Sequence, residues 1–144
     1  MTSHLAISIV VLLIQMSGVS QMHNGSGQAG LLDARAIFSD VERGISEANV
    51  SIFFHYFNSQ VHVTLRGGES GLYSANQAYY LLQNYFRARK PLKCGFSTYG
   101  DSDSNPYATG SASFNIRGSR ELVQVYVALA LSGDRWVISH INIY

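Results

Sequence analysis

The sequence is poor in the residues on which crosslinked, metal-binding and nucleic-acid-binding proteins depend. Only one of its 144 residues is cysteine. This residue, Cys94, excludes a disulfide within the chain and a zinc site made of several thiolates, and we expect it to be buried in a strand. Charged side chains make up 13% of the chain, and the formal net charge is +1. Because nucleic-acid binding needs a concentrated basic face, we expect no nucleic-acid partner.

Sequence patterns for metals and cofactors are missing as well. No two of the five histidines have a His-x-x-x-His spacing, and no glycine-rich loop ends in Lys-Ser or Lys-Thr. The segment from Asp101 to Asn105 resembles the start of a calcium loop. However, Pro106 and Ala112 occupy the positions of the required glycine and glutamate. We therefore expect no metal and no other cofactor.

The N-terminal segment has the pattern of a secretory signal. Residues 1–21 contain no Lys, Arg, Asp or Glu, and residues 5–14 form an apolar run interrupted only by Ser8. This run is shorter than the roughly 20 apolar residues that span a bilayer, and Gly18 and Ser20 suit a cleavage site after Ser20. We expect residues 1–20 to be a signal peptide, with membrane contact only during export, and the mature protein to be periplasmic or extracellular. The alternative is an N-terminal membrane anchor or a buried helix.

The remaining chain is expected to contain a short leader and one domain. Residues 21–30 are rich in glycine and serine and have no periodicity, which predicts a flexible leader. Residues 31–144 then form a single domain. Its first helix is expected over residues 31–47, with Asp33 as the N-cap, because apolar residues recur at helical spacing.

Two further helices are predicted. A short aromatic helix is expected over residues 50–57. The clearest helix begins at Ser74, where Gln77 completes a capping box, and ends before Pro91.

Alternation of apolar and polar residues predicts strands in the rest of the chain. They are expected over residues 61–66, 71–74, 92–99, 107–117, 121–131 and 135–144. Small residues on one face of the strand over 107–117 indicate that another element, most simply a helix, packs closely there. This order predicts an α+β domain whose helices cover the concave face of a curved antiparallel sheet.

The predicted order of elements resembles the nuclear transport factor 2-like (NTF2-like) superfamily, a cone-shaped α+β fold that includes SnoaL-like and cystatin-like proteins. Within it, three segments are similar to an exported bacterial family of unknown function. They are Tyr56–Leu65 (YFNSQVHVTL), Gly71–Ala78 (GLYSANQA) and Asp134–Ile138 (DRWVI). A fold of this kind supports enzymes and binding modules alike, so the resemblance implies a fold and leaves the chemistry open.

The resemblance implies that any catalytic acid or base projects into the cone between the sheet and the helices. His62 is a poor candidate, because Val61 and its alternating neighbours occupy the core face of that strand. His140 shares its parity with Trp136, so an inward Trp136 would place His140 in the cavity. The candidate ligand-cavity residues are Tyr56, Tyr79, Tyr85, Trp136 and His140. We expect Asp40 to be a solvated charge and His55 to be a surface residue, with a position at the cone mouth as the alternative.

No general base with an orienting partner is evident among these residues. We therefore expect a non-catalytic domain that binds a small ligand or a protein partner, in the cone or across the outer sheet face. The alternative is an isomerase- or dehydratase-like enzyme that uses His140 and the cavity tyrosines, which a cone filled by apolar side chains would exclude. The resemblance also implies a homodimer through the polar sheet face outside the cone, with a monomer as the alternative.

Overall fold

The structure, a computed structural model, describes residues 24–102 and 105–144. The predicted signal peptide and its cleavage site lie outside these residues. In the part of the chain that is described, no helix is long and apolar enough to cross a membrane. The elements are α1 (Asn24–Ser46), η1 (Val50–Ile52), η2 (Phe54–Tyr56), β1 (Phe57–Leu65), β2 (Ser70–Ser74), α2 (Ala75–Arg89), β3 (Pro91–Ser102), β4 (Asn105–Ile116), β5 (Ser119–Ser132) and β6 (Arg135–Ile143).

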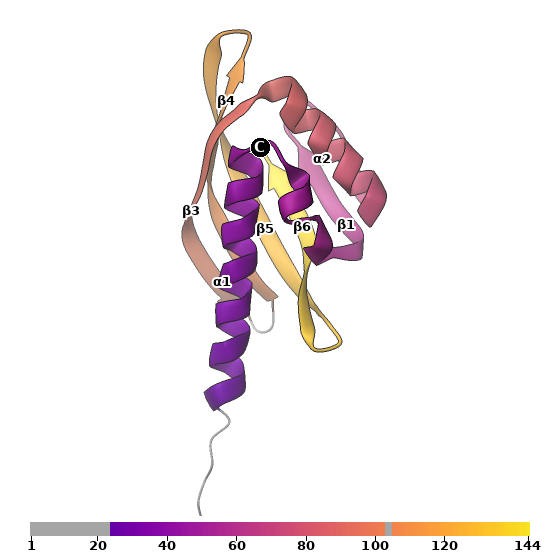
Figure 1. Ribbon diagram of the computed structural model, residues 1–144, viewed down its shortest axis with the longest axis vertical. Helices are drawn as coiled ribbons and strands as arrows, with labels where there is room; N and C mark the ends of the chain where they lie inside the picture. The colour runs from indigo at the N-terminus through magenta and orange to yellow at the C-terminus, as the bar shows by residue number, and fades with distance from the viewer. Residues whose placement is uncertain (1–23, 103–104) are drawn as a thin grey trace, which may run out of the picture.

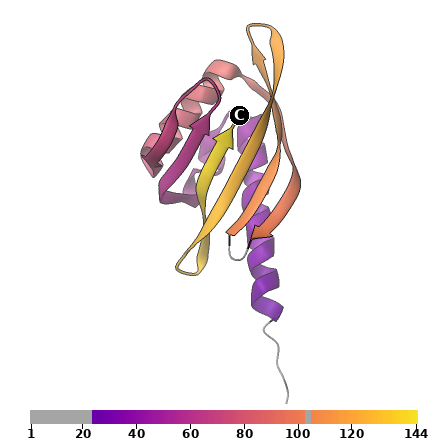
Figure 2. The ribbon, with the colours of Figure 1, turned by 180° about the vertical axis from the view of Figure 1, so that it is seen from behind.

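The strands form one six-stranded sheet in the order β2-β1-β6-β5-β4-β3. Both helices and the two short 3-10 helices lie on one face of this curved sheet, and the opposite face is uncovered (Figures 1 and 2). The prediction of an α+β domain with helices on one face is confirmed. The prediction of a wholly antiparallel sheet is wrong for one pair, because β1 and β6 run parallel. These two strands are far apart in the sequence, so no hairpin forces them to be antiparallel.

Helix α1 is longer at its N-terminus than the sequence predicted. It begins at Asn24, so most of the segment predicted as a flexible leader is helical, and Asp33 is an internal helix residue rather than the N-cap. Five apolar side chains of α1 at helical spacing are buried against the sheet: Ala34, Ile37, Phe38, Val41 and Ile45. The N-terminal turns of the helix extend past the end of the sheet (Figure 1).

Helix α2 begins as its sequence predicts. The Ser74 hydroxyl accepts a hydrogen bond from the Gln77 backbone N–H at 3.3 Å, and the Gln77 side chain accepts one from the Ser74 N–H at 3.0 Å. This reciprocal capping satisfies two N–H groups that would otherwise lack partners. The helix ends at Lys90, which adopts the left-handed conformation with φ of 47°, and Pro91 then begins β3.

The interior of the cone is filled by large apolar side chains. Phe53, Leu82 and Phe86 are fully buried between the helices and the sheet, together with Phe38 and Phe114. Phe86 and Phe114 lie 6.3 Å apart between ring centroids. These side chains therefore fill the space between the sheet and the helices, where the resemblance placed any catalytic site. A ligand has to bind nearer the surface.

Candidate functional site

One hollow on the helix side of the sheet lies at the end of the cone near the β5–β6 turn. Its volume is about 310 Å³, and it is lined by Gly30, Asp33, Ala36, Ile37, His55, Tyr56, Asp134, Arg135 and Trp136. We call it the mouth pocket. Helix α1, the short helix η2 and the β5–β6 turn each contribute one wall. The volume is at the lower end of the range of small-molecule sites.

Trp136 joins the N-terminal half of α1 to the sheet and forms one wall of the mouth pocket. Its indole N–H donates a hydrogen bond to the Gly30 carbonyl at 2.9 Å. A Cβ at position 30 would lie 3.4 Å from the indole nitrogen, so a larger residue there would crowd this contact. The bond fixes the orientation of the indole ring at the pocket.

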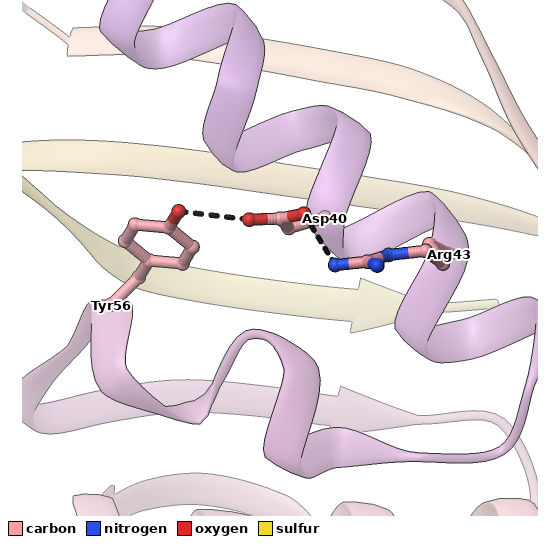
Figure 3. A network of polar contacts seen from close by, with 3 residues as sticks. All are labelled: Asp40, Arg43 and Tyr56. Carbon is pink, nitrogen blue, oxygen red and sulfur yellow. Dashed lines mark hydrogen bonds and ion pairs between the residues drawn. The ribbon is translucent and has the colours of Figure 1, made fainter.

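Tyr56 also lines the mouth pocket and is held by a polar network (Figure 3). Its hydroxyl donates to Asp40 Oδ2 at 2.8 Å, and Asp40 Oδ1 accepts from the Arg43 guanidinium at 2.9 Å. Partial burial and the bond to the Asp40 carboxylate raise the pKa of Tyr56 above its ordinary value. Asp40 is thus half-buried and fully engaged, which corrects the prediction of a solvated charge.

His55 lies at the pocket rim, where its ring centroid is 3.9 Å from that of Tyr56. The residue is exposed, as expected, and it also lines the mouth pocket, which was the alternative position.

His140 lies on the outer face of the sheet and not in the cone. In the pairing of β6 with β5, Ile138 is opposite Leu129 and His140 is opposite the adjacent residue, Ala128. Ser139 is therefore an extra residue, a β-bulge, and it reverses the alternation of inward and outward side chains beyond it. Trp136 faces the helices, but the inference that an inward Trp136 would place His140 in the cavity is wrong.

On the outer face, His140 stacks on His62 of the neighbouring parallel strand. The ring centroids are 4.9 Å apart and the planes are inclined by 9°. His62 is exposed, in agreement with its predicted outward position. The enzyme alternative, which needs His140 beside the cavity tyrosines, is therefore not supported by the geometry.

The two other predicted cavity tyrosines lie apart from the mouth pocket. Tyr79, on α2, is hydrogen-bonded through its hydroxyl to Ser51 Oγ at 3.0 Å and borders a separate surface hollow. The Tyr85 hydroxyl donates to the Arg66 carbonyl at 2.9 Å, near the β1–β2 turn, and the side chain is buried. Of the five predicted cavity residues, the structure brings together only Tyr56 and Trp136.

Several residues of the mouth pocket were missed because their proximity depends on the tertiary fold. Asp134 and Arg135 belong to the last turn of the chain, and Asp33 and Ala36 belong to the first helix. The sequence did contain a signal for the polar network beside the pocket. Asp40 and Arg43 are three residues apart on a helix, a spacing at which an aspartate and an arginine commonly form an ion pair.

The stacked histidines predict a pH-dependent stability. Burial, with a smaller contribution from the His62 charge, lowers the pKa of His140. As the pH falls below about 6.5, the unfolded chain takes up this proton before the folded chain, so acid lowers the free energy of unfolding. Because solvent screens the half-buried ring, we expect this loss to be under about 1 kcal/mol. Urea unfolding at pH 8 and pH 5 measures it.

Variants identify the source of that loss. The free energy of unfolding is expected to differ between pH 8 and pH 5 partly because of this ring. His140→Gln should remove most of that part of the difference, and His62→Gln should reduce it. His55→Gln, at the mouth pocket, should leave that contribution unchanged. An identical acid sensitivity in the parent and in His140→Gln would show that the stacked pair has no part in it.

Other reactive groups are not arranged as a site. In residues 24–102 and 105–144, no three or more His, Cys, Asp or Glu side chains come close enough to hold a metal ion. Cys94 is buried in β3, as predicted, and desolvation, followed by the charge of Glu42, raises the pKa of its thiol to about 12. A thiol with so high a pKa is a poor nucleophile at neutral pH.

The sheet order and the helices on its concave face give this chain the NTF2-like fold, and the fold expected from the resemblance is confirmed. More narrowly, the chain belongs to the DUF4783 family, a domain of unknown function whose model matches residues 38–144. Among curated proteins, none matches the chain.

Solved structures with the same fold include members of this family. A DUF4783 protein from Bacteroides uniformis is 16% identical, covers 73% of this chain and 93% of its own, and has a TM-score of 0.65. An NTF2-like protein from Anabaena variabilis is 14% identical, with coverages of 87% and 93% and a TM-score of 0.65. A cystatin-fold protein from Novosphingobium aromaticivorans is 13% identical, with coverages of 76% and 95% and a TM-score of 0.57. At these identities the likeness shows the fold.

Proposed function

We propose that this protein is an exported, non-catalytic domain that binds a small molecule in the mouth pocket. The observation that carries the proposal is the composition of that pocket, in which Trp136 and Tyr56 face a hollow of about 310 Å³. A concave aromatic lining with a few polar groups is typical of small-molecule sites. Export is inferred from the apolar N-terminal segment with its small residues at positions 18 and 20.

The polar network beside the pocket supports binding rather than catalysis. A general base must be free to accept a proton from the substrate. Asp40 instead accepts hydrogen bonds at both carboxylate oxygens, from Tyr56 and from Arg43. The Tyr56 hydroxyl is engaged as a donor, and its raised pKa keeps it protonated at neutral pH. The network therefore serves to hold the Tyr56 ring in position.

The charges at the rim indicate the class of ligand. Asp33 and Asp134 outnumber Arg135 among the charged lining residues, which leaves a net charge of −1 beside two aromatic faces. Aromatic faces attract cations, most strongly for tryptophan. We infer a ligand with a planar apolar part and an amine, such as a small aromatic amine, in preference to an acid of the same shape.

Tryptophan fluorescence tests this proposal directly, because Trp136 is the only tryptophan of the chain. Emission is measured while the protein, from residue 21 onward, is titrated with phenethylamine, with phenylacetate and with phenylacetamide. We expect a saturable change with the amine, weaker binding of the amide and the weakest binding of the acid. The absence of a saturable change with all three probes would contradict the proposal.

A matched pair of variants assigns the response to the pocket. Ala36 is exposed and lines the pocket, so Ala36→Leu should fill part of it and weaken binding by about tenfold or more, which corresponds to about 1.4 kcal/mol. Ser39→Leu places the same side chain at an exposed position of the same helix outside the lining. Equal binding by both variants would show that the emission change arises elsewhere.

The homodimer through the outer sheet face remains a proposal. That face is uncovered (Figure 2) and carries two pairs of neighbouring rings, the stacked pair of His62 with His140 and the tilted pair of Tyr107 with Tyr126. A partly polar, aromatic surface of this kind is compatible with a moderate protein interface.

A further inference from the structure

A second hollow lies on the outer face of the sheet, on the opposite side from the mouth pocket. It has a volume of about 320 Å³ and is lined by Lys93, Gly95, Phe96, Ser111, Ser113, Arg120 and Leu122. We call it the outer groove. Lys93 pairs with Ser113 and Gly95 with Ser111 across β3 and β4, and Ser113 pairs with Leu122 across β4 and β5. The groove therefore crosses three neighbouring strands.

Ser113 is the residue in the groove that most needs an explanation. Its side chain is 3% exposed, and its Oγ has no hydrogen-bond partner within the described part of the chain. A buried hydroxyl without a partner is destabilising, and native structures seldom retain one without a reason. An alanine at this position would fit the strand without that cost. Ser113 lines the groove, where a ligand could serve as the partner of its hydroxyl.

The charge of the groove selects the partner. Lys93 and Arg120 are its charged lining residues, and both are exposed. Within the described ranges, neither forms an ion pair. Glu42 is the acidic side chain near Phe96, but it belongs to α1 and lies on the helix side of the sheet. Its carboxylate accepts a hydrogen bond from the Phe96 N–H. Two cations and two hydroxyl donors with no acidic lining residue favour an oxyanion.

Gly95 leaves room for such a ligand. A Cβ built at this position would meet no heavy atom within 4 Å, so the strand is open to the groove there. Beside it, Ser111 is half-buried and presents a second hydroxyl, and Leu122 is 65% exposed at the groove edge. The floor is thus polar and the rim is partly apolar.

We propose that the outer groove binds a phosphate group, with Lys93 and Arg120 pairing with its charge and Ser111 and Ser113 donating hydrogen bonds to its oxygens. The phosphate can be free or can be part of a lipid headgroup packed on Leu122. This inference is independent of the function proposed for the mouth pocket, because the two hollows lie on opposite faces of the sheet.

The test is a titration with inorganic phosphate, followed by amide NMR shifts at a constant ionic strength maintained with chloride. Saturable shifts are expected at Gly95, Ser111 and Ser113. Binding should weaken by about tenfold in Lys93→Gln, in Arg120→Gln and in Ser113→Ala, as expected for the loss of a hydrogen bond or ion pair to a charged group. Arg87→Gln, an exposed arginine of α2 outside the groove, should bind as the parent does.

A second readout separates a ligand-binding role of Ser113 from a structural one. If the buried hydroxyl lacks a partner in the free protein, Ser113→Ala should unfold at a higher urea concentration than the parent while it binds phosphate less well. A variant that loses stability and retains binding would overturn the proposal.

Vesicles distinguish the two sources of phosphate. Sedimentation with phosphatidylglycerol vesicles, compared with phosphatidylcholine vesicles, measures headgroup binding. Binding to either inorganic phosphate or the anionic vesicles supports the proposal if it depends on Lys93, Arg120 and Ser113. If neither binds, or if the three variants bind as well as Arg87→Gln, the groove is not a phosphate site.

Discussion

Replacement of Gly110 by alanine is expected to destabilise the fold by about 3 kcal/mol or more, at the upper end of the usual cost of overpacking. Gly110 is buried in β4. A Cβ at this position would overlap the Gly95 carbonyl oxygen and would lie 2.6 Å from the Phe96 Cα. These are backbone atoms of β3, which cannot rotate away as a flexible side chain could. Urea unfolding measures the change.

Gly95→Ala is the matched control, because Gly95 lies on β3, the strand whose backbone the added methyl group of Gly110→Ala would overlap. Its added methyl group meets nothing within 4 Å, so we expect a change of less than about 1 kcal/mol. If the two alanine variants were equally stable, the close approach of β3 to β4 would not be a constraint on the fold.

Gly110 also shows how far a sequence pattern can be interpreted. The small residues of this strand correctly predicted that something packs closely against it. The expected neighbour was a helix, but at Gly110 it is the adjacent strand β3. The pairing of β3 with β4 shifts register between Phe96 and Thr98, and a bulge brings a strand backbone out of its regular path. Spacing within one strand carries no information about a bulge in its neighbour.

The same limit explains His140. Strict alternation in β6 predicted that Trp136 and His140 lie on the same face of the sheet. The single extra residue Ser139 instead places them on opposite faces. The Ser139 hydroxyl donates to the Ala128 carbonyl at 3.1 Å and contacts His140 Nδ1 at 3.0 Å. No local residue preference marks this bulge in the sequence. In contrast, the start of α2 was predictable because Ser74 and Gln77 act within one turn.

The start of α1 illustrates a tertiary contact that overrides local preference. Residues 21–30 are rich in glycine and serine and were predicted to be flexible, yet the helix includes Gly30. Trp136, 106 residues later in the chain, donates its hydrogen bond to the Gly30 carbonyl. Helical stability in proteins depends largely on such packing. The mouth pocket arises from this same long-range contact, so only parts of it could be predicted.

The aromatic filling of the cone is therefore what confines the proposed ligand site to the mouth. We expect Phe53→Ala to lower the free energy of unfolding by about 3–5 kcal/mol, the usual cost of removing a buried phenylalanine. Phe53 is fully buried, lies 5.8 Å from Phe57 between ring centroids and packs against Gly44. Its removal should leave an apolar cavity inside the cone. Urea unfolding with and without benzene measures both effects, because a dry cavity of this kind can bind benzene.

Phe54→Ala is the control, because it removes the same side chain at the adjacent position. Phe54 is only half-buried, with its ring 5.0 Å from Tyr79 and 5.6 Å from Phe57 between centroids. Its loss should cost about 1–2 kcal/mol, since less apolar area leaves water in the folded state. Benzene should stabilise Phe53→Ala and leave Phe54→Ala unchanged. Equal costs, with no effect of benzene on either variant, would mean that Phe53 does not fill the interior of the cone.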